Sequence, residues 1–369
     1  MKSFILLSIT FLLLTTCVEH HQESSTKVDI FEKIQDIDIK YAKRFSVDTT
    51  HKAYTKIEIN SGDSKYKFYD SIFIPHSSNY NFNNHKVIYN NYKNIAIQSV
   101  TYFAYLEAID MTSSIKGLSG FDYMSKNDIK KVLRKNKVIE ISNEGEILME
   151  KLLKINPDLF LIYPYELETA SKYKRNGIQT LLVAEYLEST PLGRLEWIKF
   201  FGLVFNNYHK ANAIFNQKEK SYLKLKQAYD STKTLFFNLP FNDNWAMPST
   251  NSVTVNLATD AGLSYIYKKE TSVDNLVLSK EEVWEQAIHS KYWIIIASRP
   301  KKFSLKDLLK EEDIYKEFEA VKNGNVIFCN TSFTDYFTRG PVQPELMLQD
   351  LINCINKNDT STTYFKILK

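Results

Sequence analysis

The spacing of hydrophobic and polar residues changes along the chain, and the first change marks off a β-rich segment. Between residues 38 and 94, aromatic and β-branched side chains alternate or cluster in short runs such as AYTKIEIN at 53–60. Turn-forming residues, among them Asn60 and Gly62, separate these runs. Short runs of this kind between turn residues are typical of β-strands. We therefore expect an N-terminal β extension over residues 38–94.

From residue 95 onward, short apolar runs alternate with amphipathic segments of helical length. This alternation occurs over residues 95–209 and again over residues 233–369. Strands that alternate with helices argue for βα units around a mainly parallel sheet. The pattern predicts an α/β fold with two lobes, whose strand-like runs are IAIQSV at 95–100, VIEIS at 138–142, DLFLIYP at 158–164, TLFFNLPF at 234–241, YWIIIAS at 292–298 and NVIFCN at 325–330.

One long helical segment, residues 210–232, lies between the two α/β sets. Ala211, Phe215, Tyr222 and Tyr229 follow helical spacing, and no Gly or Pro interrupts the segment. At about 1.5 Å per residue, a helix of this length spans roughly 30 Å, which is about the width of a lobe. A core helix of a single domain would show the same pattern. We favour a single rigid connector that bridges the two lobes.

The first residues resemble a lipoprotein export signal. Lys2 supplies a positive charge, residues 4–14 are apolar, and Cys17 follows in the sequence LTTC. The apolar stretch is shorter than the roughly 20 residues that span a bilayer, which indicates a signal segment rather than an anchor helix. We expect a signal peptide over residues 1–16, lipidation of Cys17 and a tether over residues 17–37.

An ordinary signal peptide with an incidental cysteine is the alternative to lipidation. Thr16 favours this alternative, because Gly, Ala or Ser usually precedes the cysteine of a lipobox. Lipidation would place the protein on the periplasmic side of a bacterial membrane, anchored by its acyl chains, and would exclude cytosolic metabolism. Whether the inner or the outer membrane holds the anchor is left open.

Charge and cysteine content narrow the function classes further. The formal net charge is +4, and the lysines are interspersed with acidic residues. A nucleic-acid surface needs clustered basic residues, so we expect no nucleic-acid partner. Besides Cys17, the chain has Cys329 and Cys354, which could pair in an oxidising compartment or remain two buried thiols. Both possibilities stay open at this point.

Aromatic residues and arginines follow the predicted strands. In open α/β sheets ligands bind beyond the carboxyl ends of the strands, so these residues are candidates for a ligand cleft. Tyrosine and tryptophan would cover the flat faces of a large ligand, and arginine would pair with its anionic groups. Any one of them could instead be a packed loop residue. The candidates are Tyr102, Tyr123, Tyr165, Trp245 and Tyr336, with Arg299 and Arg339 for the anionic groups.

The sequence lacks the short motifs that carry catalytic chemistry. No GxSxG, HExxH, GxxxxGK[ST] or GxGxxG pattern occurs, and there is no CxxC pair. The seven histidines do not fall at metal-ligand spacings. Catalytic residues can still assemble from distant positions, so these observations do not exclude an enzyme. We expect a binding protein rather than an enzyme, with no cofactor and no metal site.

Several segments, taken together and in order, resemble one protein family. They are LMEKLLKINPDLFLIY at 148–163, EYLESTPLGRLEWIKFFG at 185–202, VWEQAIHSKYWII at 283–295, FEAVKNGNVIFCN at 318–330 and DYFTRGPVQPELMLQDLI at 335–352. The chain resembles the iron-complex and cobalamin type substrate-binding lipoproteins of ABC importers, in particular their Bacteroidetes-like branch. The resemblance covers most of the chain that follows the signal segment.

The resemblance implies a fold, a ligand class and a docking rule. The implied fold is that of periplasmic binding proteins with a helical backbone, whose lobes hold the ligand between them. The implied ligand is a ferric siderophore, haem or cobalamin, and the implied partners are an ABC permease and the membrane. One acidic residue on each lobe would dock on the permease, and Glu150 fits the first-lobe position. In the second lobe Asn256 stands where an acid is expected, with Asp260 and Glu270 as alternatives.

Two other functions remain open. One is a surface or sensory lipoprotein that binds a protein partner, which the N-terminal β extension would suit. The other is a periplasmic enzyme built on the same architecture. The sequence also does not select one ligand, because aromatic side chains suit haem, catecholates and corrins alike. By analogy with the family we expect a monomer.

Overall fold

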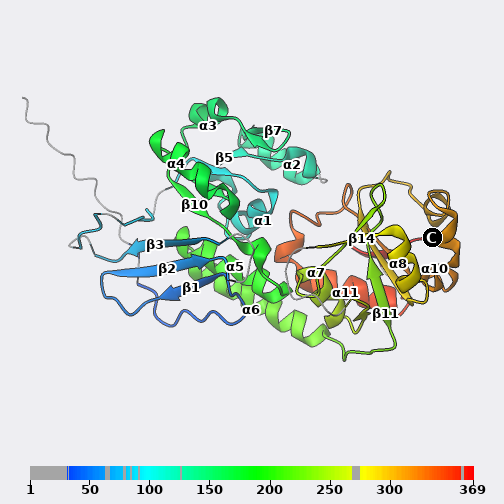
Figure 1. Cartoon of the computed structure of the whole chain (residues 1–369). Helices are drawn as coiled ribbons and strands as arrows, with labels where there is room; N and C mark the ends of the chain where they lie inside the picture. Colours follow the sequence, from blue (N-terminus) through cyan, green and yellow to red (C-terminus); the bar gives the residue numbers. More distant parts are fainter. Residues whose placement is uncertain are drawn as a thin grey trace, which may run out of the picture.

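Two α/β lobes and a small antiparallel sheet make up the molecule (Figure 1). The computed structural model describes residues 31, 33–62, 67–77, 80–83, 85–89, 92–124, 127–267, 275–358 and 361–369. The small sheet lies beside the first lobe, and the second lobe occupies the other end of the molecule. The expected α/β fold with two lobes and an N-terminal β extension is therefore confirmed.

The first lobe, which we call the N-lobe, is built around five parallel strands in the order β10-β9-β4-β5-β6. The central strands β4 and β9 are buried along their whole length, as the strands of a covered parallel sheet are. The elements are β4 (Ile95–Ile97), α1 (Val100–Ala108), β5 (Ile115–Leu118), α2 (Asn127–Lys135), β6 (Ile139–Glu140), α3 (Met149–Ile155), β9 (Leu159–Ile162), α4 (Leu167–Arg175) and β10 (Thr180–Leu182), with a small hairpin of β7 (Ser142–Asn143) and β8 (Glu146–Ile147).

The second lobe, the C-lobe, has a five-stranded sheet in the order β13-β11-β15-β16-β17, in which β17 is the antiparallel edge strand. A two-stranded sheet of β12 and β14 lies beside it. The elements are β11 (Thr234–Phe237), β12 (Asn244–Met247), α7 (Val253–Asp260), β13 (Ser264–Tyr265), β14 (Leu276–Ser279), α8 (Lys280–Ala287), β15 (Tyr292–Ala297), α9 (Leu305–Leu308), α10 (Glu319–Lys322), β16 (Val326–Asn330), α11 (Pro344–Ile355) and β17 (Lys366–Ile367).

The two sheets share a strand arrangement. In the N-lobe the first strand, β4, lies between β5 and β9, and β10 follows β9. In the C-lobe the first strand, β11, lies between β13 and β15, and β16 follows β15. The helix that leads into β9 is α3, and the helix that leads into β15 is α8. Helices α3 and α8 therefore occupy equivalent places in the two lobes.

Helices α5 (Pro191–Val204) and α6 (Tyr208–Leu225) connect the lobes. Helix α5 is buried on nearly all sides, and α6 packs along α5 and then along α11 of the C-lobe (Figure 1). The predicted connector over 210–232 exists, but it ends at Leu225. Beyond Leu225 the amide of Gln227 donates to Asp260 O at 2.8 Å, and the Asp230 carboxylate accepts from the amide of Thr232. These contacts turn the chain away from the helix axis.

The small sheet pairs β1 (Phe45–Asp48), β2 (Tyr54–Asn60) and β3 (Tyr69–Pro75) as an antiparallel meander. Strand β2 alternates buried and half-buried residues, which is the pattern of a sheet with one face on a core. The ring of Phe45 lies 4.9 Å from that of Trp197 and 5.6 Å from that of Phe200, both on α5. The extension therefore shares the core of the N-lobe.

Two buried carboxylates hold the segment that precedes β1. The backbone amides of residues 40–44 point at Glu188 and Glu196. The first three amides lie 2.7 to 3.0 Å from the carboxylate oxygens of Glu196, and the last two lie 2.9 to 3.0 Å from those of Glu188. Lys199, which is also buried, pairs with Glu196 at 2.8 Å. We call residues 40–44, Glu188 and Glu196 the amide clamp.

The structure also bears on the expected tether over residues 17–37. The amide of Phe31 donates to Pro75 O at 2.9 Å, and the Phe31 side chain is buried. The end of this segment therefore packs on the small sheet, because Phe31 and the partly buried Ile34 and Ile37 contribute apolar surface to the core. The signal peptide over residues 1–16 and Cys17 lie outside the described residues.

Candidate functional site

A hollow of about 170 Å³ lies at the carboxyl ends of β4, β5 and β9 in the N-lobe. This is the edge of a parallel sheet where ligands bind. We call it the tyrosine hollow, and its lining residues are Gln98, Ser99, Val100, Ser119, Gly120, Tyr123, Gly145, Tyr163 and Tyr165. None of these nine side chains is charged at neutral pH.

Three tyrosines form the aromatic wall of the hollow. Tyr123 and Tyr165 are 69% and 54% exposed, so their rings face solvent. The ring of Tyr163 stacks on that of Tyr165 with centroids 5.1 Å apart, and Tyr186 meets Tyr163 edge-on at 5.6 Å. Burial raises the pKa of Tyr163, so its phenol is neutral at physiological pH. The wall therefore offers flat apolar faces together with uncharged hydroxyl groups.

Local hydrogen bonds fix the loops that carry these residues. Ser99 caps α1 by accepting from the amide of Thr101, and Gln98 Oε1 accepts from the amide of Tyr163 at 2.8 Å. Gly120 has a φ of 95°, a left-handed conformation that favours glycine, and it precedes the 3₁₀ turn Phe121–Tyr123. The hollow is thus held in shape by the N-lobe itself.

The carboxylate of Glu140 fixes the same loop from behind. It accepts from the amides of Gly120 and Phe121, at 3.2 and 2.7 Å, and from the amide and hydroxyl of Ser142, at 3.0 and 2.7 Å. Ser119 in turn donates its hydroxyl to Ser142 Oγ at 2.8 Å. The carboxylate of Glu140 is therefore engaged in hydrogen bonds that hold the loop next to the hollow.

The C-lobe contributes the loop over residues 331–339 to the other side of this region. The hydroxyl of Thr101 donates to Phe337 O at 2.8 Å, which brings the loop against the first turn of α1, next to the hollow. Phe333 and Phe337 on this loop are exposed. We use the name inter-lobe cleft for the region made up of the tyrosine hollow and the adjoining loop 331–339.

Arg339 joins the lobes at the edge of this cleft. Its guanidinium binds Glu107 of α1 in a bidentate manner at 2.6 and 2.7 Å, and it binds Asp128 of α2 at 2.7 Å. Asp335 of its own loop lies 3.3 Å away. We call Arg339, Glu107, Asp128 and Asp335 the boundary cluster. Hydrogen bonds and charge pairing with these carboxylates raise the pKa of Arg339, and the same pairing lowers the pKa of Asp128 despite its partial burial.

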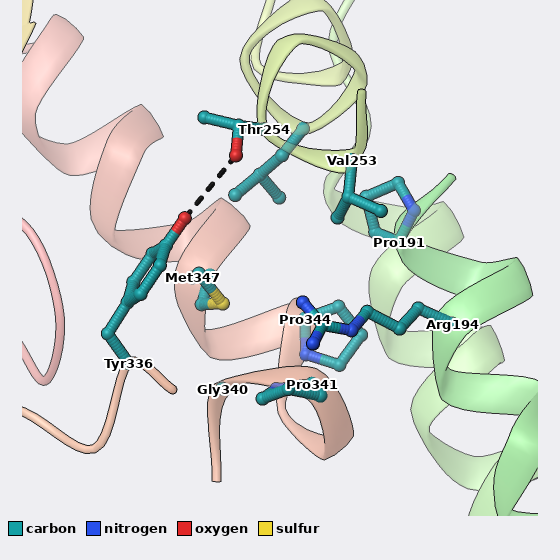
Figure 2. A pocket seen from close by; sticks show the side chains of 10 residues that line it. Pro191, Arg194, Val253, Thr254, Tyr336, Gly340, Pro341, Pro344 and Met347 are labelled. Carbon is teal, nitrogen blue, oxygen red and sulfur yellow. Dashed lines mark hydrogen bonds between the residues drawn. The ribbon is translucent and has the colours of Figure 1, made fainter. Parts of the chain in front are cut away.

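A second, smaller cavity of about 40 Å³ lies deeper, where α5 meets α7 and α11 (Figure 2). Arg194 points into it from the N-lobe, and the hydroxyl of Tyr336 lies 3.4 Å from that of Thr254 on its C-lobe side. Arg194 also pairs with Glu185 at 2.5 Å. The cavity has room for a few water molecules at most, so it marks the packed seam between the lobes.

The structure brings some of the predicted site residues together and separates others. Tyr123 and Tyr165 meet in the tyrosine hollow, whereas Tyr336 lines the seam cavity. Tyr102 and Trp245 are fully buried. Tyr102 donates its hydroxyl to a backbone carbonyl of the N-lobe at 3.0 Å, and Trp245 donates its indole N–H to one in the C-lobe at 2.9 Å. Tyr102 and Trp245 are therefore core residues of the N-lobe and the C-lobe, respectively, and do not line the hollow.

The two arginines predicted to meet anionic groups already have carboxylate partners. Arg339 belongs to the boundary cluster, and Arg299 binds Glu311 through two nitrogens at 3.2 Å. Seven of the nine residues that line the tyrosine hollow were not predicted as site residues, among them Gln98 and Ser99, which come directly after β4. The position of Gln98 and Ser99, between a strand and the first turn of a helix, could have indicated them as site residues.

The permease-docking candidates have different surroundings. Glu150 is exposed in the first turn of α3. Asn256 donates its side-chain amide to Ser189 O at 2.9 Å, so it belongs to the contact between the lobes. Asp260 is paired with Lys226 at 2.7 Å and accepts the hydroxyl of Tyr222 at 2.8 Å. Glu270 lies outside the described residues.

Two further observations concern cysteines and metal ligands. Cys329 and Cys354 are buried and unpaired, and burial raises the pKa of each thiol to about 12. They therefore act as packed apolar side chains.

In the part of the chain that the structure describes, no group of three or more His, Cys, Asp or Glu residues is placed to hold a metal ion. None of the helices described there has the length and apolar character needed to cross a bilayer.

Comparisons with known proteins agree with this architecture. An uncharacterized lipoprotein of Methanocaldococcus jannaschii is 28% identical over 286 residues, covering 74% of this chain and 67% of that protein. A periplasmic haem-binding protein of Pseudomonas aeruginosa superposes with a TM-score of 0.59 at 12% identity, covering 76% of this chain and 99% of its own. The catecholate-siderophore binding protein of Vibrio cholerae gives a TM-score of 0.57 at 17% identity, covering 72% and 94%.

These structural likenesses show the fold, and a family profile shows the membership. The profile of the periplasmic binding protein family matches residues 95–332, which include both five-stranded sheets except for the edge strand β17. On this match the chain belongs to the periplasmic binding protein family.

Proposed function

We propose that the protein is the lipid-anchored solute-binding component of an ABC importer, which captures an iron complex or cobalamin in the inter-lobe cleft and delivers it to the permease. The observation that carries this proposal is the tyrosine hollow, an aromatic and hydroxyl-lined surface at the carboxyl ends of the N-lobe strands. The loop 331–339, on which Phe333 and Phe337 are exposed, contacts the first turn of α1 beside this hollow across the lobe boundary. Flat, bulky ligands with polar edges suit such a surface.

The contacts between the lobes support capture with little domain motion. Arg339 with its N-lobe partners, Thr101 with Phe337 O, and Asn256 with Ser189 O all cross the boundary. A ligand would then bind to a cleft that is largely formed beforehand, which lowers the entropy cost of association. Uptake receptors work at Kd values from micromolar to nanomolar, or roughly −8 to −12 kcal/mol, which a few aromatic anchors can supply.

The anchor and the location follow from the signal segment. Lipidation of Cys17 would hold the protein on the periplasmic side of a membrane. The lipoprotein of M. jannaschii, to which the chain is similar, supports this part of the proposal by its name. The proposal treats the protein as a monomer.

We place the two docking acids at Glu150 and Glu281. Helices α3 and α8 occupy equivalent places in the two lobes, and Glu150 and Glu281 are each the second residue of their helix. Both side chains are exposed. The pair therefore offers one carboxylate on each lobe for two arginines of a permease. Glu281 replaces the candidates that the sequence suggested, since Asn256 and Asp260 are engaged within the protein.

Charge reversal at both positions tests the docking assignment. Cells that carry the double variant Glu150→Arg and Glu281→Arg are expected to lose uptake of the ligand by about tenfold or more, because like charges would then face each other. The purified variant should bind the ligand with a Kd close to that of the wild-type protein. Glu285→Arg, which reverses an exposed charge further along α8, is the matched control and should leave uptake unchanged. Equal loss of binding and uptake in the double variant would contradict the assignment.

A further inference from the structure

The charges around the inter-lobe cleft restrict the ligand more than its aromatic walls do. We propose that the cleft selects a bulky metal complex whose net charge is zero or positive, such as a ferric trihydroxamate or a corrinoid, over anionic ferric catecholates and haem. This inference rests on the proposed function and adds the charge class of the ligand. It departs from the expectation from sequence that Arg299 and Arg339 meet an anionic ligand.

The tyrosine hollow carries no charge of its own. Its nine lining residues are uncharged, so the hollow itself offers no cation to an anionic ligand. One carboxylate next to it is that of Glu140, which lies behind the loop and accepts from the amides of Gly120 and Phe121. A negative ligand in the hollow would therefore lose part of its hydration without gaining a counter-charge from the lining residues, which costs free energy.

The arginines named so far are already paired with carboxylates. One guanidinium, that of Arg339, meets three carboxylates, so the boundary cluster has a formal net charge of −2. Arg194 is matched by Glu185, and Arg299 is matched by Glu311. Among the described residues, each of these three arginines is therefore neutralised or outnumbered by carboxylates.

Anionic ligands and neutral or positive complexes would meet different free-energy costs in the cleft. To recruit Arg339, an anionic ligand would have to displace Glu107, whose hydrogen bond at 2.6 Å is partly buried, or Asp128, whose hydrogen bond at 2.7 Å is exposed. Displacing either carboxylate gives up charge-assisted hydrogen bonds, which are stronger than neutral ones, and so costs free energy. A neutral complex avoids this cost, because it can stack on the rings of Tyr123 and Tyr165 and accept hydrogen bonds from their hydroxyls. A positive complex gains further from the net negative boundary cluster.

A matched pair of ferric hydroxamates provides the test. Ferrioxamine E is neutral and ferrioxamine B is singly positive, and both present iron in the same chemistry. The full-length protein in detergent would be titrated by calorimetry with these two, with cyanocobalamin, with triply negative ferric enterobactin and with haem. We expect binding of at least one ferrioxamine or of cyanocobalamin at micromolar concentration or below. Ferric enterobactin and haem should bind at least tenfold more weakly than that ligand.

A variant of the boundary cluster sharpens the test. Asp128→Asn removes one negative charge, and Asp128 is largely exposed, so the variant should fold. Its affinity for ferrioxamine B relative to ferrioxamine E should fall about two- to tenfold at low salt, and high salt should reduce the difference. Asp313→Asn, which removes an exposed carboxylate paired with Lys316 in the C-lobe, is the control and should leave the ratio unchanged.

The outcomes separate this inference from the proposed function. Preferential binding of ferric enterobactin or haem, with an affinity that falls as salt is added, would overturn the charge class and leave the binding function intact. If none of the five metal complexes binds at concentrations up to about 100 μM, which corresponds to roughly −5.5 kcal/mol, the proposed function itself is contradicted. An affinity ratio of ferrioxamine B to ferrioxamine E that is the same in Asp128→Asn and in the wild-type protein would contradict the part assigned to the boundary cluster.

Discussion

The amide clamp and the boundary cluster both use carboxylates to join distant parts of the chain, but they differ in burial. In the clamp, Glu188 and Glu196 are 3% and 0% exposed, and their partners are mostly backbone amides. In the boundary cluster, the side chains of Glu107 and Asp128 are 31% and 56% exposed, and their partner is the side chain of Arg339. The comparison indicates that buried carboxylates hold a segment in place as part of the core, whereas partly exposed carboxylates form a contact that water can compete with.

Removal of a clamp carboxylate should have the largest effect. Glu196→Ala would leave the buried ammonium of Lys199 without its counter-charge and three backbone amides without an acceptor. We expect the free energy of unfolding to fall by about 3–5 kcal/mol, as for other broken buried ion pairs. Urea denaturation followed by circular dichroism measures this change. The exposed Glu285→Ala is the control, and a loss below about 1 kcal/mol for Glu196→Ala would show that the clamp is not structural.

Loss of the boundary arginine should have an intermediate effect. Arg339→Met keeps the apolar stem but removes charged hydrogen bonds to the other lobe, so we expect a loss of about 1.5–3 kcal/mol in thermal unfolding. The bound ligand should also dissociate faster, because the lobes are less firmly joined. Arg299→Met is the matched control, since its pair with Glu311 is partly exposed and such pairs contribute about 0–1 kcal/mol. Equal losses in the two variants would contradict the role of Arg339 as a link between lobes.

The pH dependence of the clamp should give the smallest effect. Burial raises the pKa of Glu188, although the indole of Trp197 and two amides oppose this shift. The folded state therefore favours the protonated carboxyl, so this contribution to stability is present at pH values below the ordinary pKa of glutamate. It is lost as the pH rises through the raised pKa.

The variant Glu188→Gln cannot titrate at this position and isolates the effect. From about pH 4 to pH 7 the stability of the wild-type protein should fall relative to the variant, by about 1 kcal/mol or less. Urea denaturation of both proteins across this range measures the difference. A wild-type protein that gains stability relative to the variant as the pH rises would show that hydrogen bonding outweighs burial at Glu188.

The fold and the candidate site could be predicted from the sequence to different degrees. The alternation of apolar runs and amphipathic segments depends on local spacing, and it correctly indicated the two α/β lobes. Tyr123 and Tyr165 were recognised because they follow strands, and both lie in the hollow. Tyr102 also follows a strand, but it lies on α1, and the position along the chain does not show that the first seven residues of this helix are all buried.

Other site features depend on contacts between distant residues. Trp245 lies in β12, where exposed and buried residues alternate, and only the pairing with β14 decides which set is covered. Two of the three carboxylate partners of Arg339, Asp128 and Glu107, lie 211 and 232 residues earlier in the sequence. No local pattern indicates that this arginine is already neutralised. The charge class of the cleft therefore needed the folded structure.

The single passage of the chain between the lobes has a consequence for evolution. Within the described residues, the N-lobe sheet lies in residues 95–182 and the C-lobe sheet in residues 234–367, with α6 between them. Each wall of the cleft is thus encoded by one uninterrupted stretch of the gene. A recombination event within the codons of α6 would exchange one complete wall and leave the other unchanged. New ligand preferences could arise in this way by combining existing halves, without point mutations in either wall.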